Sequence, residues 1–232
     1  MNTTIYDQYQ ENKRFVSVDC VIFGYEDEQL KLLVFQRDIE PCKGEWSLLG
    51  GWVNAGESTE DAARRVLNKL TGLEDVYLEQ VHTFSDPKRD PGGSVITVEY
   101  YALINIDEKA RNLINDYGAQ WYTLDDLPAL IFDHQILVEK ALEKLRLRSS
   151  YEIIGRKLLP AKFTITRLRN LYDQIFQKKF DPGNFRKKIL SLKVLERLEE
   201  KDMSESRKGA FYFKFKPKND GEFNDPIFKR SI

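Results

Sequence analysis

The spacing of hydrophobic and polar residues predicts a strand-rich first part of the chain. Residues 15–23 place apolar side chains on both faces of an extended segment, which is typical of a buried strand. Similar runs predict further strands at residues 30–37, 46–52 and 94–104. One helix is predicted between them over 58–71, because Ser58 can cap its first turn and Gly72 can end it. Strands that enclose a single helix predict an α+β domain.

The second part of the chain has hydrophobic residues mainly at helical spacing. Helices are predicted there at about 133–149, 166–177 and 182–192. The last of these has Asp181 as its N-cap and Pro182 at its first position. Residues 209–217 then alternate phenylalanine with tyrosine or lysine, as a half-buried strand does. We therefore expect the helix at 133–149 to link the strand-rich part to a smaller helical part.

The distribution of charge supports a division near residue 150. Residues 1–150 contain 16 basic and 26 acidic side chains, whereas residues 151–232 contain 20 and 11. We therefore predict two domains with these bounds. The basic domain indicates a polyanionic partner, which would repel the acidic domain unless that domain binds a small ligand instead.

Cysteine content and hydropathy bear on the compartment. Cys20 and Cys42 are too few for a disulfide framework or a zinc site. Residues 1–14 are polar and lack the apolar stretch of an export signal. No run reaches the roughly 18 apolar residues that span a bilayer. We expect a cytoplasmic protein that binds no cofactor and does not enter the membrane.

Residues 51–73, GWVNAGESTEDAARRVLNKLTGL, resemble the Nudix box, the loop-helix-loop motif of enzymes that cleave diphosphate bonds with magnesium or manganese. The residues that fit its frame are Gly51, Glu57, Arg65, Leu67, Gly72 and Leu73. The resemblance covers about residues 15–130. It implies a mixed α/β/α sandwich for the first domain.

The metal-binding positions of the box have changed. Where that family has three glutamates, this sequence has Val66, Lys69 and Leu70. A divalent cation needs several oxygen ligands, and diphosphate cleavage needs the cation to neutralise developing charge. We therefore expect no metal site and no metal-dependent hydrolysis. A metal site relocated to Glu57 or Glu99 leaves a hydrolase of nucleoside diphosphate compounds as an alternative.

The basic second domain predicts a winged helix-turn-helix. Its second helix would enter the major groove of DNA and the strand at 209–217 would form the wing. Asparagine and arginine can bond to base edges, and lysines can hold phosphates. The candidate DNA-binding residues are Thr164, Thr166, Arg167, Asn184, Arg186, Lys187, Lys188, Lys208, Lys214 and Lys216. A solvated helix face on a module that binds only proteins is the alternative interpretation.

A Nudix-like domain followed by a winged helix is similar to the Nudix-related transcriptional regulators, the NrtR group. Within that group the chain looks most similar to the arabinose regulators of the Bacteroidetes, AraR. The resemblance implies a homodimeric repressor of L-arabinose utilisation genes, which holds a palindromic operator in double-stranded DNA until L-arabinose binds. A regulator that responds to ADP-ribose is a further alternative.

Candidate effector-binding residues surround the glycine turn at Gly50 and Gly51. A neutral pentose needs hydrogen-bonding groups and an apolar plate, whereas a diphosphate needs cations or a helix N-terminus. Asp19 and Glu99 lie on apolar strands, where carboxylates would oppose a diphosphate. The full set is Asp19, Arg37, Trp46, Gly50, Gly51, Trp52, Phe84, Glu99 and Tyr101. An ordinary salt bridge or core aromatic is the alternative for each of them.

Overall fold

The structure is a computed structural model. It describes residues 12–73, 76–107, 111, 118–204, 208–217, 223 and 226–228. The polar segment 1–11, most of the tail after residue 217 and the side chain of Leu70 lie outside the described residues.

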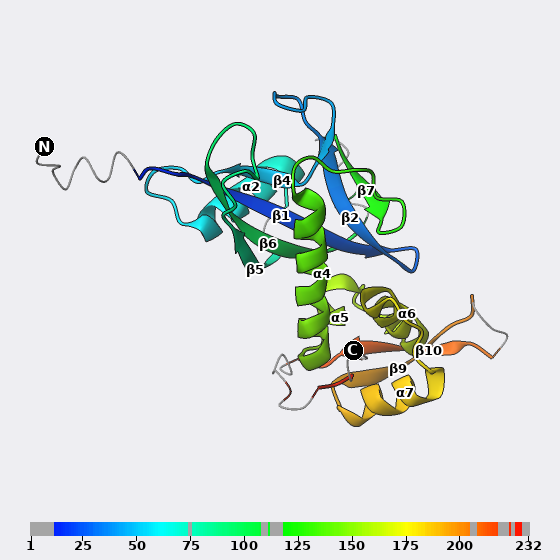
Figure 1. Cartoon of the computed structure of the whole chain (residues 1–232). Helices are drawn as coiled ribbons and strands as arrows, with labels where there is room; N and C mark the ends of the chain where they lie inside the picture. The colour runs from blue at the N-terminus through cyan, green and yellow to red at the C-terminus, as the bar shows by residue number, and fades with distance from the viewer. Residues whose placement is uncertain are drawn as a thin grey trace, which may run out of the picture.

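A mixed β-sheet forms the first half of the molecule (Figure 1). Its strands are β1 (Phe15–Glu26), β2 (Gln29–Gln36), β3 (Trp46–Ser47), β4 (Leu49–Trp52), β5 (Tyr77–Phe84), β6 (Val95–Asn105) and β7 (Ala119–Thr123). The order is β3-β2-β1-β6-β5, with β4 paired to β1 and β7 to β2. The central pair β1–β6 is parallel and the others are antiparallel. Strands β5 and β7 were not predicted from the sequence.

Two helices cover opposite faces of this sheet. Helix α2 (Thr59–Thr71) packs against even-numbered residues of β1 and β6, and α4 (His134–Tyr151) against odd-numbered ones. The caps expected for α2 are confirmed: the Ser58 hydroxyl accepts the Asp61 backbone N–H at 3.1 Å, and Gly72 ends the helix at φ 68°. The fold of this half is the predicted α/β/α sandwich.

The second half is a winged helix, as predicted. Its helices are α5 (Gly155–Leu158), α6 (Ile165–Phe176) and α7 (Pro182–Ser191), and its strands are β8 (Phe163–Thr164), β9 (Leu195–Asp202) and β10 (Ala210–Phe215). The sheet order is β8-β10-β9, antiparallel throughout. The Asp181 carboxylate accepts the Asn184 backbone N–H at 2.8 Å and so caps α7 as expected.

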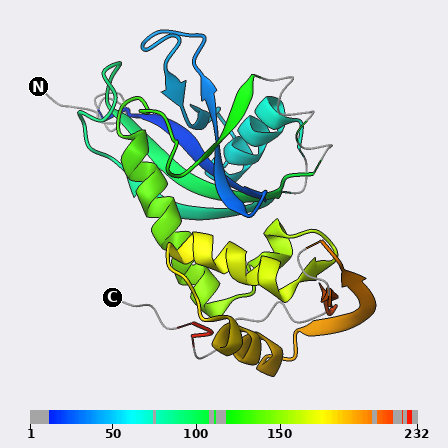
Figure 2. The ribbon, with the colours of Figure 1, turned by 90° about the vertical axis from the view of Figure 1, so that its right-hand side faces the viewer.

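Helix α4 runs from one half to the other (Figures 1 and 2). One hydrophobic cluster continues from the sheet through Leu137, Ala141 and Leu145 of α4 into the winged helix. Arg146 in α4 donates to the carbonyl of Ile175 in α6 at 2.9 Å. The halves therefore share a core. No helix among the described residues is long and apolar enough to cross a membrane.

Candidate ligand pocket and nucleic-acid interface

A pocket of about 440 Å³ opens beside the amino-terminal end of α4. The predicted residues that line it are Asp19, Arg37, Gly50, Gly51 and Trp52. The pocket also has lining residues that were not predicted, among them Phe15, Glu40, Arg89, Asp90 and His134. Rings of Phe15 and Trp52 lie 5.6 Å apart at its edge and are more than half exposed. Strand β1, its partner β4 and the start of α4 thus bring the site together.

The other predicted effector residues do not line this pocket. Glu99 and Tyr101 are fully buried, and the Tyr101 hydroxyl donates to Glu79 at 2.8 Å. Both belong to the sheet face that α4 covers, so packing removes them from the opening. Trp46 and Phe84 are partly buried against the core. These four residues therefore do not line the pocket, and effector binding by them stays a prediction.

A buried charged cluster forms the floor of the pocket. The side chain of Arg89 donates to both carboxylate oxygens of Asp133, at 2.9 and 2.8 Å. Its Nη2 also lies 3.5 Å from Oδ2 of Asp19, which accepts a hydrogen bond from Thr97 at 2.7 Å. Two carboxylates therefore compensate the Arg89 cation.

His134, the first residue of α4, is held in a defined orientation. Its Nδ1 accepts the backbone N–H of Leu48 at 3.1 Å. Burial lowers the pKa of His134 below its ordinary value, so the ring is neutral at physiological pH. The sequence signals for Arg89 and His134 were weak: the first directly precedes an Asp-Pro-Gly-Gly segment and the second lies at a helix start.

Glu99 is an acid enclosed by the fold. Among the described residues, neither carboxyl oxygen of Glu99 has a hydrogen-bond partner. Burial, and then the charge of neighbouring Asp19, raises the pKa of Glu99 to about 9. Its carboxyl is therefore protonated at neutral pH.

The helix of the Nudix-like motif keeps its scaffold contacts. Glu57 accepts two hydrogen bonds from Arg65, at 2.6 and 2.8 Å, which lower the pKa of the Glu57 carboxyl to about 2. Val66 is buried, and one of its methyl carbons would lie 2.8 Å from a Cβ atom placed on Gly51. Lys69 is exposed. Over the described residues there is no group of three histidine, cysteine or acidic side chains placed to hold a metal ion. At the metal-binding positions of this helix, the side chains of Val66 and Lys69 do not fit a divalent cation, because neither has an oxygen donor.

Helix α7 presents a polar outer face. Phe185 and Ile189 are buried and fix its inner face. The exposed residues are Asn184, Arg186, Lys187 and Lys188. Within the described part of the chain, none of these three cations forms an ion pair, so all are free to meet an anion.

Three candidate DNA-binding residues lie at the start of α6. Thr164 is buried, and its hydroxyl accepts the backbone N–H of Arg167 at 3.1 Å, so this side chain caps the helix. The Thr164 side chain thus has a structural role as the N-cap of α6, and its contact with DNA stays a prediction. Thr166 and Arg167 are half-buried.

The wing carries acids as well as lysines. Lys208 and Lys214 are exposed and Lys216 is half-buried. Lys214 pairs across the strands with Glu196 at 3.2 Å. A phosphate would have to compete with this exposed pair, which is worth at most about 1 kcal/mol.

Comparison with known proteins agrees with this architecture. The family model of the NUDIX domain matches residues 13–144, and that of the NrtR DNA-binding winged helix domain matches residues 155–215. The fold and both domains define a Nudix-related two-domain protein.

Similarity to individual proteins identifies the family within this class. The ADPR responsive transcriptional repressor NtrR of Acinetobacter baylyi is 32% identical over 88% of this chain and 85% of that protein. The crystal structure of Shewanella oneidensis NrtR complexed with a 27mer DNA matches with a TM-score of 0.80 and 29% identity, over 91% of this chain and 98% of that one. An ADP-ribose pyrophosphatase of Methanocaldococcus jannaschii is 33% identical over 53% of this chain and 70% of its own length. The chain belongs to the NrtR family.

Proposed function

We propose that this chain is a cytoplasmic, homodimeric transcriptional repressor. Residues 151–232 would bind a palindromic operator in double-stranded DNA, and a small effector bound within residues 1–150 would release it. The observation that carries the proposal is the cationic outer face of α7, joined through a shared core to a domain that keeps a ligand pocket. The A. baylyi relative, named as a repressor, supports the same role.

The Nudix-like domain serves as a sensor in this proposal. Val66 and Lys69 supply no oxygen ligand where a Nudix enzyme holds its metal, and Lys69 repels a cation. The alternative, hydrolysis of nucleoside diphosphate compounds, takes its support from the pyrophosphatase relative. The donor set of the helix argues against that alternative.

We propose L-arabinose as the effector. The charge of Arg89 is already compensated inside the pocket, and Glu40 and Asp90 add negative charge to its lining. Such surroundings favour a neutral polyol over a diphosphate. The exposed rings of Phe15 and Trp52 offer an apolar surface for the C–H face of a sugar. None of the three relatives above is named for arabinose, so the proposal rests on this chemistry and on the resemblance noted from the sequence.

ADP-ribose is the second candidate effector. It is supported by the A. baylyi relative, which is named as an ADPR responsive repressor. One pocket cation favours it: Arg37 forms no ion pair with any described residue, and its guanidinium lies 5.8 Å from the centre of the Phe132 ring. Arg37 could meet one phosphate.

The test uses the purified full-length chain and duplexes that it selects from a random DNA pool. We expect binding that weakens steeply with salt and falls roughly 5- to 150-fold at saturating L-arabinose. Lys187→Ala should weaken binding, whereas Lys69→Ala, which removes an exposed cation from the Nudix-like half, should not. Absence of salt-dependent binding would overturn the repressor proposal. A response to ADP-ribose alone would replace L-arabinose as the effector.

A further inference from the structure

Two buried polar atoms face each other at the pocket floor without touching. Oδ1 of Asp19 lies 3.8 Å from Nε2 of His134, which is too long for a hydrogen bond. Both residues line the pocket, and both are more than nine-tenths buried. Oδ2 of Asp19 is already engaged, since it accepts from Thr97 and faces Arg89. Oδ1 is the oxygen left for a ligand.

The hydrogen-bonding role of His134 Nε2 follows from its other nitrogen. A backbone N–H only donates, so Nδ1 of His134 must accept from Leu48 and carry no proton. Because burial keeps the ring neutral, its single proton is on Nε2. The gap thus has a fixed donor on one side and a carboxylate acceptor on the other.

We propose that Asp19 and His134 together form a seat for one hydroxyl group of the effector. The hydroxyl oxygen accepts from Nε2–H of His134 and donates its own proton to Oδ1 of Asp19. An oxygen about 2.8 Å from each atom fits the 3.8 Å gap. The inference rests on the proposed sensing function and adds the atoms that recognise the ligand.

The seat selects for chemistry as well as size. A phosphate oxygen without a proton would satisfy His134 but repel Asp19, and a methyl group would satisfy neither. Gly50 keeps the seat open, because a Cβ at that position would lie 2.3 Å from Oδ1 of Asp19. A hydroxyl of a free sugar and a ribose hydroxyl of a nucleotide sugar share the chemistry that fits.

The seat is tested by calorimetric titration of the full-length chain with L-arabinose and, in a separate arm, with ADP-ribose. Asp19→Asn and His134→Gln should each weaken binding about tenfold or more, the usual effect of losing a hydrogen bond to a charged or buried partner. Glu139→Gln is the matched control. It removes one exposed carboxylate from α4, the helix that carries His134, at a position outside the pocket lining. We expect the affinity of this variant for each ligand to equal that of the wild type.

Deoxy analogues of L-arabinose keep the test decisive if a variant folds poorly. The wild type should bind the analogue that lacks the seated hydroxyl about tenfold more weakly than L-arabinose. The His134→Gln variant should bind that analogue and L-arabinose with equal affinity. If both seat variants bind the ligand with wild-type affinity, the seat is overturned and the effector proposal still stands. If the wild type binds neither L-arabinose nor ADP-ribose, the effector proposal fails, and the seat fails with it.

Discussion

Replacement of Glu99 by glutamine should change how the stability of the protein depends on pH. The carboxyl of Glu99 is fully buried, and its pKa is about 9 in the folded chain against an ordinary value of 4.5. Between these values the unfolded chain has lost the proton and the folded chain keeps it. Unfolding therefore releases a proton, and the free energy of unfolding falls as pH rises. The slope is about 1.4 kcal/mol per pH unit, or about 3 kcal/mol from pH 6 to pH 8.

Glu99→Gln has nearly the same shape and cannot ionise, so it lacks this contribution. The stability of the variant relative to the wild type should rise by about 1.4 kcal/mol for each pH unit between 6 and 8. Urea denaturation at pH 6, 7 and 8 measures the difference. Groups that titrate in both proteins, including His134, cancel in it to first order.

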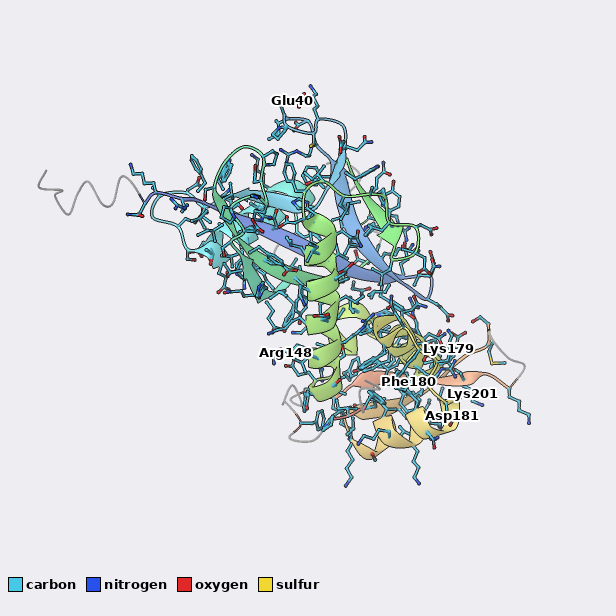
Figure 3. The ribbon with its side chains drawn as sticks, viewed as in Figure 1. Glu40, Arg148, Lys179, Phe180, Asp181 and Lys201 are labelled. Carbon is cyan, nitrogen blue, oxygen red and sulfur yellow. The ribbon has the colours of Figure 1, made fainter. Side chains whose placement is uncertain are left out.

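Glu40→Gln is the control for this experiment, because it makes the same chemical change at an exposed side chain, at the tip of the loop after β2 (Figure 3). Its stability should run parallel to that of the wild type. Parallel curves for Glu99→Gln as well would refute the reasoning, since they would mean that the folded protein carries an ionised carboxylate at this position.

Further predictions concern the winged helix and the motif helix. Arg186→Ala should weaken DNA binding and relax base preference, whereas Lys214→Ala should weaken all sequences alike; a selection experiment with each variant checks this, and equal, negligible effects would place the DNA contacts elsewhere. Asp181→Ala should cost about 1 kcal/mol of stability, measured by urea denaturation, because it removes the N-cap of α7. The purified chain should not cleave ADP-ribose in the presence of magnesium; rapid, metal-dependent product formation on chromatography would contradict the sensor role.

The elements predicted well from sequence are those with a strong local signal. Helices α2 and α7 have their caps in the sequence, and β10 alternates phenylalanine with tyrosine or lysine, with Phe213 buried and Lys214 exposed. Strand β9 has no such pattern: only Leu195 is buried, and the strand is held by pairing with β10. Its sequence, LERLEEKD, is mostly charged and therefore has no alternation of hydrophobic and polar residues that would predict a strand.

The pocket was only partly predictable for a related reason. Asp19 stands out as an acid on an apolar strand, so the pattern alone marks it. Arg89 and Asp133 meet only after the chain folds across 44 residues of sequence separation. Glu99 looked like Asp19 in the sequence, but α4 covers it in the structure. A local sequence pattern identifies an unusual residue, but it does not show whether that residue lines the pocket.

The helix that joins the two halves has a mechanical consequence. Helix α4 has 18 residues, so its axis is about 27 Å long. His134 at one end lies in the pocket floor, and Arg146 near the other end bonds to α6. A rotation of about 5° at the pocket would displace the far end by about 2 Å, given that length. In the proposed function, the residues that bind the ligand and the domain that contacts DNA would therefore meet opposite ends of the same helix.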